Sequence, residues 1–139
     1  MNFLFLILKD IQEEHKKHGN LIPKIENLFN EIRRNLDLKK LEDFKKILKD
    51  LKIELKEHFF KEESKLFPKI INKSNELLIT NLEKEHMELL NLLEKLDKNI
   101  ERILNGEYIW AEFRYNIKEF LHTLNDHILK EDYQLLPSI

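Results

Sequence analysis

Histidine and glutamate stand four residues apart at two places in this sequence, and each pair could bind a metal. His58 precedes Glu62, and His127 precedes Glu131. Residues four apart differ by about 40° around a helix, so each pair would direct an imidazole and a carboxylate to the same side. A set of imidazoles and carboxylates suits iron or manganese, with zinc conceivable, and among these we expect two iron ions ahead of manganese or zinc. The two pairs therefore indicate a metal-binding function.

Both pairs belong to a longer internal repeat. Residues 58–68 and 127–137 follow one pattern, H-x-x-K-E-[E/D]-x-x-L-[F/L]-P, and a Glu-His dipeptide recurs at 14–15 and 85–86. The chain is therefore interpreted as two similar helical hairpins. Each would supply one histidine from its first helix and the His-x-x-x-Glu pair from its second. Packing about a pseudo-twofold axis would bring two equivalent half-sites face to face.

Apolar residues at alternating steps of three and four predict four amphipathic helices, whose inward stripes run over residues 8–32, 41–62, 79–103 and 113–135. The predicted inward positions are Leu8, Ile11, His15, His18, Ile22, Ile25, Phe29, Ile32, Leu41, Phe44, Leu48, Leu51, Leu55, His58, Glu62, Ile79, Leu82, His86, Leu89, Leu93, Leu96, Ile100, Ile103, Phe113, Ile117, Phe120, Leu124, His127, Glu131 and Leu135.

The breaks between these stretches predict short connections. Asp37 can cap the start of the second helix, Pro68 follows its end, and Ser74 can cap the third. Gly106 suits the C-terminus of the third helix. Because short connections force neighbouring helices to run antiparallel, we expect an all-α, up-down-up-down four-helix bundle. A length of 139 residues fits one domain, residues 1–139.

Counting from the predicted helix ends at about 1.5 Å per residue places one histidine of each helix within roughly one turn of a common level. Buried polar side chains are costly unless they have partners, and isolated salt-bridged core histidines would not need to meet at one level. The predicted ligands of a two-metal site are His15, His58, Glu62, His86, His127 and Glu131. If both glutamates bridge, the protein fills roughly eight of twelve octahedral positions, and an oxo or hydroxo bridge leaves about one open position per iron.

Three further residues are expected near this site. His18 lies one turn from His15 on the same stripe and is a candidate supporting, gating or additional ligand. Glu63 and Asp132 lie about 140° from the histidine direction on an ideal helix, so we expect them to face outward or to orient the ligands.

The composition excludes several classes of function. The chain has no cysteine, which excludes disulfides, thiolate catalysis and iron–sulfur ligation. A formal charge of −2 does not favour nucleic acid or anionic lipid as a partner. The apolar run at 3–8 is too short to cross a membrane and lacks the features of a signal peptide, so a cytoplasmic location is expected.

With these motifs, the chain resembles the hemerythrin-like, His-His-Glu cation-binding family over nearly its whole length. The most specific stretches are residues 58–68 and the His127–Glu131 pair, and the resemblance is closest to the di-iron domain of the repair-of-iron-centres (RIC) proteins. It implies that the four histidines His15, His58, His86 and His127 are terminal ligands and that Glu62 and Glu131 are bridges.

Two departures from oxygen-carrying hemerythrins bear on function. Those proteins have a fifth histidine one turn after the ligand of the third helix, where this chain has Leu90. They also take a carboxylate five residues after the last histidine, where this chain has Asp132, so a local bulge could present Asp132 in place of Glu131.

The expected function is that of a non-haem di-iron protein in iron handling, iron-centre repair or the response to oxygen and nitric oxide. O2 or NO would be its small ligand, and an iron-accepting protein is a candidate partner. The alternative is a reversible O2 carrier, store or sensor, and a metal-dependent regulatory module is a third hypothesis. Whether the protein is an enzyme stays open, because no nucleophile–base pair is found apart from the metal site.

Overall fold

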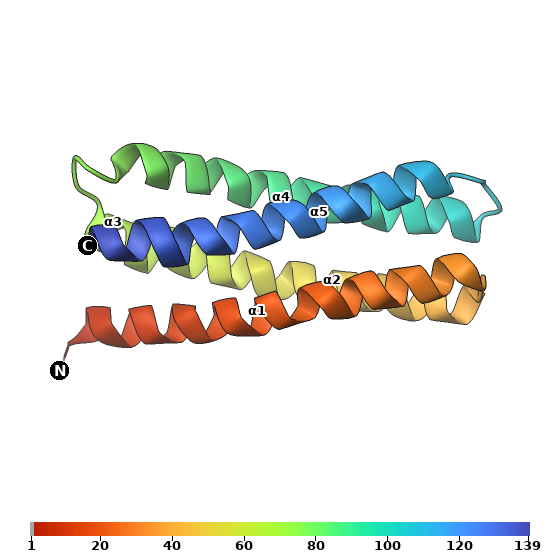
Figure 1. Ribbon diagram of the computed structural model, residues 1–139, viewed down its shortest axis with the longest axis horizontal. Helices are drawn as coiled ribbons and strands as arrows, with labels where there is room; N and C mark the ends of the chain where they lie inside the picture. The colour runs from red at the N-terminus through yellow and green to blue at the C-terminus, as the bar shows by residue number, and fades with distance from the viewer. Residues whose placement is uncertain (1) are drawn as a thin grey trace.

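The computed structural model describes residues 2–139 and contains four long helices that form a bundle (Figure 1). They are α1 (Phe3–Arg34), α2 (Leu38–Lys61), α4 (Glu76–Leu104) and α5 (Trp110–Lys130). No strand occurs within these described residues. The all-α prediction is confirmed.

Each hairpin ends in a widened helical turn that continues the second helix of the pair. After α2 come a π-helical turn, η1 (Glu62–Leu66), and a last α-helical turn, α3 (Phe67–Ile70). After α5 come a second π-helical turn, η2 (Glu131–Leu135), and a 3-10 turn, η3 (Leu136–Ser138). The internal repeat is thus a structural repeat.

The four long helices lie at the corners of a square. Helix α1 packs against α2 and α5, and α4 packs against the same two helices. Consecutive long helices run in opposite directions, and both chain ends lie at the same end of the bundle (Figure 1). The predicted up-down-up-down order is confirmed. No helix in the described chain has a stretch apolar and long enough to cross a membrane.

Helix boundaries follow from a few capping residues. The Asp37 carboxylate accepts hydrogen bonds from the backbone N–H groups of Lys39 and Lys40, as predicted for an N-cap. Gly106 has φ +93°, a left-handed conformation that favours glycine just after the end of α4. The prediction for Ser74 is wrong, because α4 begins one residue later and the Asn72 side chain accepts from the backbone N–H of Ser74 instead.

Pro68 does not end the second helical rod, which corrects the predicted boundary. It lies inside α3, the helical turn that follows η1. A proline clashes with the carbonyl four residues earlier and donates no hydrogen bond, so it disrupts a regular α-helix. In the π turn the Phe67 N–H reaches back five residues to the carbonyl of Glu62, and this wider turn lets the rod continue past Pro68.

The hydrophobic core is divided into two clusters. Every predicted inward position is buried except Leu8 and Ile22, which are half-buried. The larger cluster fills the middle of the bundle and the end that carries the α1–α2 and α4–α5 connections. The smaller one closes the end near the chain termini and contains Ile11, Leu66, Phe67, Ile70, Ile79, Leu82 and Leu135. The inward-facing histidines and glutamates lie between the two clusters.

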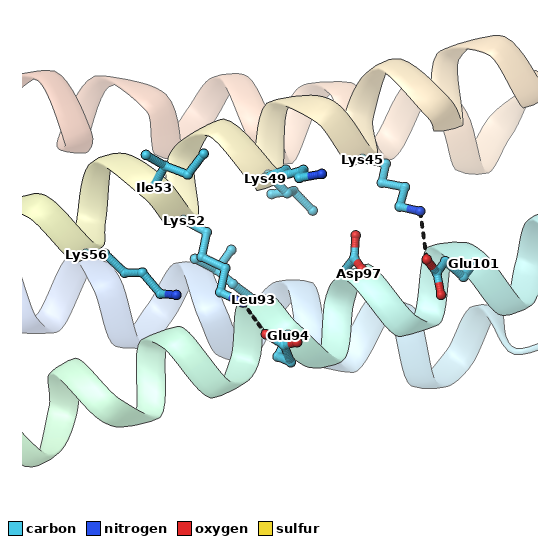
Figure 2. Close-up of a pocket in the computed structure, with 10 residues that line it drawn as sticks. Lys45, Lys49, Lys52, Ile53, Lys56, Leu93, Glu94, Asp97 and Glu101 are labelled. Carbon is cyan, nitrogen blue, oxygen red and sulfur yellow. Dashed lines mark hydrogen bonds and ion pairs between the residues drawn. The ribbon is translucent and has the colours of Figure 1, made fainter.

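Ion pairs tie α2 to α4 on the surface. Lys45 contacts Glu101 at 2.9 Å, and Lys52 contacts Glu94 across the groove between these helices (Figure 2). Such exposed pairs contribute little stability each, about 0–1 kcal/mol. They border the core and have no part in the polar layer.

Candidate metal centre

Each of the four long helices contributes one buried histidine to the polar layer. His15 comes from α1, His58 from α2, His86 from α4 and His127 from α5, and each is 3% exposed or less. Glu62 and Glu131 begin the two π turns and are 0% and 1% exposed. The structure therefore brings all six sequence-predicted residues together.

The carboxylate of Glu131 lies between histidines of both hairpins. Its Oε2 is 2.9 Å from Nε2 of His15, while its Oε1 is 2.5 Å from Nε2 of His127 and 3.6 Å from Nε2 of His86. The two oxygens thus face opposite halves of the site. A bridge between two metals requires this placement.

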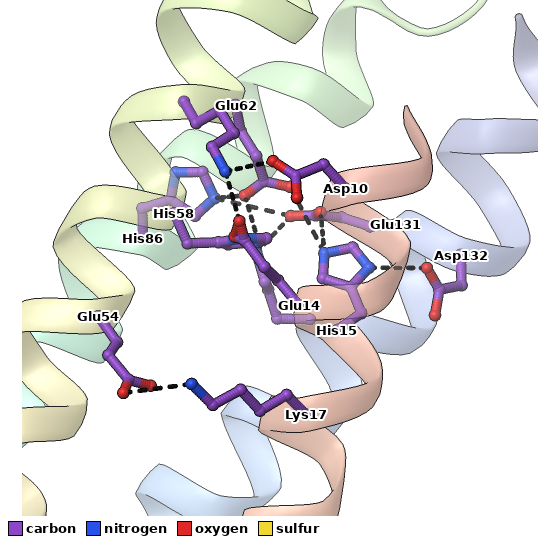
Figure 3. A network of polar contacts seen from close by, with 12 residues as sticks. Asp10, Glu14, His15, Lys17, Glu54, His58, Glu62, His86, Glu131 and Asp132 are labelled. Carbon is purple, nitrogen blue, oxygen red and sulfur yellow. Dashed lines mark hydrogen bonds and ion pairs between the residues drawn. The ribbon is translucent and has the colours of Figure 1, made fainter. Parts of the chain in front are cut away.

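Glu62 takes a similar central position. Its Oε1 lies 3.3 Å from Nε2 of His58 and 3.1 Å from Nε2 of His86, and its Oε2 lies 3.6 Å from Nε2 of His15. Both glutamates therefore contact both hairpins (Figure 3).

The six side chains form two overlapping groups of four. One group is His15, His58, Glu62 and Glu131, and the other is Glu62, His86, His127 and Glu131. Within each group one potential ligand atom from every residue lies within 4.8 Å of the others. We call these the His15/His58 half-site and the His86/His127 half-site. They share both glutamates, as a two-metal site with bridging carboxylates requires.

A second layer of carboxylates contacts the outer nitrogen of three of the four histidines. The Nδ1 atom of His15 lies 2.7 Å from Asp132, that of His58 lies 2.8 Å from Glu14, and that of His127 lies 2.8 Å from Glu85. An Nδ1–H that donates to a carboxylate leaves the Nε2 lone pair free to bind a metal, and it fixes the orientation of the ring.

His86 differs from the other three. Its Nδ1 is 3.5 Å from Oε2 of Glu63, too long and too poorly directed to count as a hydrogen bond. The ring is held instead by stacking on Phe59, with centroids 3.9 Å apart and planes 10° apart, and Phe67 lies parallel beyond at 5.9 Å. Aromatic packing therefore orients His86.

The lysine of the repeat completes the second layer in both hairpins. Lys61 lies 2.5 Å from Glu14, and Lys130 lies 2.5 Å from Glu85. Each lysine thus holds the glutamate that contacts the histidine three residues before it, His58 or His127. The pattern H-x-x-K-E has a physical reason at each of its polar positions.

The π turns let adjacent residues face different partners. Glu131 points into the site, while Asp132 reaches Nδ1 of His15 from outside. A π turn places an extra residue in the turn, which rotates the residues after it. Asp132 therefore does not replace Glu131 in the polar layer, and it orients a histidine as predicted.

Eight atoms of this layer lack a hydrogen-bond partner within the described chain. They are Nε2 of His15, Nδ1 and Nε2 of His86, Nε2 of His127 and both carboxylate oxygens of Glu62 and Glu131. Several lie close together, yet their directions do not form hydrogen bonds. Burying so many unsatisfied polar atoms is costly unless a ligand occupies the space they face. The donor set therefore fits a pair of cations.

Electrostatics strengthen this interpretation. Burial lowers the pKa of His15, but its contacts with Asp132, Glu131 and Glu62 outweigh burial and raise it to about 12. The same opposition raises the pKa of His86 to about 9. Burial raises the pKa of Glu131, yet its contacts with Glu62, His127 and His15 hold it well below its usual value. Protons thus occupy the positive positions that cations would take.

His18 is buried beside the site but lies outside both groups of four. Its ring meets that of His58 edge-on at 5.1 Å. Burial, and then the charges of His58 and His15, lower the pKa of His18 to about 4, so its imidazole is neutral at pH 7. It is therefore not one of the six convergent residues.

Sequence reasoning missed the roles of Glu14, Glu85, Lys61 and Lys130. The internal repeat did contain a signal, because Glu14 matches Glu85 and Lys61 matches Lys130. Helical periodicity alone does not reveal their roles, since these residues lie beside the inward stripe. Each glutamate contacts a histidine of the neighbouring helix.

Comparison with known proteins gives one match. The family model described as "Hemerythrin HHE cation binding domain" matches residues 6–139. Neither the search of curated proteins nor the search of solved structures found a match. The matched segment contains both half-sites and all four long helices except the first residues of α1.

Proposed function

Because the chain belongs to the hemerythrin HHE cation-binding family, we propose that it is a non-haem di-iron protein that acts in iron handling, iron-centre repair or the response to oxygen and nitric oxide. The observation that carries this proposal is that seven of the eight unsatisfied atoms, all except the outer Nδ1 of His86, converge between the two half-sites.

The six residues would act as ligands to two metal ions. His15 and His58 would bind one ion, and His86 and His127 the other, with both glutamates shared. Iron is favoured because a mixed imidazole and carboxylate set with room for further ligands suits non-haem iron. When bound, iron would supply one-electron chemistry and a position for a small diatomic ligand. The chain itself supplies fixed imidazole orientations and a largely apolar surrounding.

Reversible O2 carriage is the less well supported of the two candidate functions. Leu90, half-buried, stands where oxygen-carrying relatives have a fifth histidine. With one imidazole fewer, the reduced site is more open and is expected to oxidise irreversibly. Iron handling or consumption of O2 or NO agrees better with such a site.

Anaerobic reconstitution of the metal-free protein with Fe(II), followed by metal analysis, tests the proposal. We expect two irons per chain. Glu62→Ala and Glu131→Ala should each reduce loading well below two, because each removes a shared ligand. Glu119→Ala, on the exposed face of α5, is the matched control and should keep full loading. A wild-type protein that binds no iron would overturn the proposal.

Exposure of the loaded protein to O2 or NO then separates the two functions. Net consumption of either gas supports the proposed function. Quantitative return of O2 under vacuum would support carriage and contradict it.

A further inference from the structure

A surface hollow between α1 and α2 reaches one side of the candidate metal centre. It has a volume of about 420 Å³, and it is lined by Glu14, Lys17, His18, Glu54, Glu57, His58 and Lys61. His58 is a proposed ligand, so the hollow borders the His15/His58 half-site. Figure 3 shows Glu14 and His58 near the centre and Glu54 farther along the same two helices.

His18 is the unusual residue of this hollow. It is 3% exposed, yet no hydrogen bond or ion pair between described residues involves it. The ring nitrogens of His18 are not among the fully enclosed atoms that lack a hydrogen-bond partner, so they are open to the hollow. The ring of His58 lies edge-on to that of His18 at 5.1 Å. A ligand that enters the hollow can therefore reach the His18 nitrogens beside a proposed metal ligand.

The internal repeat offers a natural comparison. The Glu-His dipeptides at 14–15 and 85–86 are 71 residues apart, so Leu89 occupies the position equivalent to His18. Leu89 is 0% exposed and belongs to the main hydrophobic cluster. The bundle therefore does not need a histidine at this position for packing. His18 is an addition in one hairpin only.

The hollow has a net negative charge, because its lining has the three carboxylates of Glu14, Glu54 and Glu57 against the two lysines Lys17 and Lys61. Glu54 is half-buried, and Glu57 is exposed. Lys17 reaches Glu54 across the two helices at 3.4 Å, and both side chains of this pair remain in contact with solvent (Figure 3). Such a pair is worth at most about 1 kcal/mol, so a divalent cation can displace the lysine easily.

We propose that His18 and the glutamates of this hollow form a transient cation-binding position through which a divalent transition metal enters and leaves the His15/His58 half-site. This inference rests on the proposed di-metal function. The metal would exchange bound water for Glu54 or Glu57, then for the His18 imidazole, and then for the ligands of the centre. The His86/His127 half-site, which Phe59 and Phe67 cover, would exchange more slowly.

The test is anaerobic stopped-flow uptake of Co(II), with the final stoichiometry measured by metal analysis. Wild-type protein should fill in two phases, the faster one at the His15/His58 half-site. His18→Leu introduces the residue of the other hairpin, and it should slow the fast phase by about tenfold while two metals still bind. Release to an excess of chelator should slow in the same way.

A surface variant gives an independent readout. Glu57→Gln should also slow the fast phase, and added salt should reduce the difference from wild type because the attraction is electrostatic. Glu88→Gln makes the same charge change at an exposed position of α4, and it should leave both phases unchanged.

Three outcomes would overturn the inference. Unchanged fast phases in both His18→Leu and Glu57→Gln would remove the entry route. Loss of one metal from His18→Leu at equilibrium would make His18 a permanent ligand. Wild-type protein that binds no Co(II) and no Fe(II) would instead refute the di-metal function on which the inference rests.

Discussion

At the scale of single residues, each imidazole of the centre directs its inner nitrogen at a shared carboxylate, and three of the four are held at the outer nitrogen. The inner nitrogen faces Glu62 or Glu131, and for three of the four the outer nitrogen has a close carboxylate partner. A carboxylate on the outer nitrogen raises the basicity of the ring and fixes its orientation, so such partners commonly change metal affinity by about 10–100-fold.

The unequal outer contacts predict unequal effects of mutation. Asp132→Asn should weaken metal binding by about 10–100-fold, because the amide loses the charge that faces His15 at 2.7 Å. Glu63→Gln is the matched change in the other hairpin and should have less effect, since its contact with His86 is 3.5 Å and stacking holds that ring. Competition against a chelator measures both. A larger loss for Glu63→Gln would contradict the assigned roles.

The raised histidine pKa values predict opposite pH dependences for stability and metal binding. In the metal-free protein the pKa of His86 is about 9, against 6.5 when unfolded, so protonation of His86 stabilises the fold. That contribution is complete below pH 6.5 and is lost as the pH rises through 9. The thermal midpoint of metal-free protein should therefore fall over this interval, while metal affinity rises because metals bind neutral imidazole.

Calorimetry of chelator-treated protein and metal titrations at both ends of the interval measure the two trends. The lowered pKa of Glu131 has no effect there, because its contribution is lost only at acidic pH. A metal-free midpoint that increased from pH 6.5 to 9 would contradict the pKa assignments.

Residue types and spacing were enough to predict the convergent set at this scale. Helical periodicity and the common level placed His15, His58, His86 and His127 in one layer, and the structure brings them together. The contacts of Glu14 with His58 and of Glu85 with His127 were not predictable in this way. They depend on the separation and rotation of neighbouring helices, which a stripe of inward residues does not determine.

At the scale of elements, the two π turns are the feature that shapes the site. Each turn begins at a glutamate of the polar layer, and a proline, Pro68 or Pro137, stands six residues after that glutamate. Ordinary α-helical spacing from His58 and His127 directs Glu62 and Glu131 inward, and the wider turn that follows returns the next apolar residues to the core. The turn therefore reconciles metal binding with closure of the bundle end.

Deleting one residue from a π turn should show this role. Removing exposed Lys65 would take out the extra residue, so that an α-helical turn could form while Leu66, Phe67 and Ile70 keep their inward orientation. Pro68 would then stand inside a regular α-helix and clash with the carbonyl four residues earlier, so we expect a loss of about 3 kcal/mol in urea unfolding.

Removing Gln134 is the matched deletion in η2. Only one fully buried side chain, Leu135, follows it, so the loss should be clearly smaller. Equal losses for the two deletions, or none for Lys65, would contradict this account of the π turns.

Periodicity predicted the four long helices but not these turns. A widened turn changes the apolar spacing by one residue only, which looks like ordinary variation between steps of three and four. Pro68 was therefore interpreted as the end of a helix. A proline stands six residues after each glutamate, and this repeat was the one sequence feature that could have indicated a π turn. It could be interpreted only with the backbone hydrogen bonds of the structure.

At the scale of the whole molecule, the polar layer separates two hydrophobic clusters and contains a residue from every long helix. Without a metal, this layer contains eight buried atoms that lack a hydrogen-bond partner within residues 2–139. Cations would satisfy all of these atoms except the outer Nδ1 of His86, and they would link both hairpins through the shared glutamates. Stability of the bundle and occupancy of the site are therefore expected to be coupled.

Removal of the metal should lower the thermal midpoint substantially. A ligand at about 100 times its Kd stabilises the folded state by about 2.7 kcal/mol, which corresponds to roughly 10 °C for a domain of this size. Calorimetry of loaded and chelator-treated protein at one pH measures the difference. His58→Ala should abolish most of it, whereas Glu119→Ala should not. Identical midpoints with and without metal would contradict the coupling.

The central claim is that two metals lie between two half-sites that share Glu62 and Glu131. Anomalous diffraction from crystals of the iron-loaded protein tests it most directly. We expect two peaks about 3.5–4 Å apart, one beside His15 and His58 and the other beside His86 and His127. A single peak, or peaks away from these residues, would contradict it.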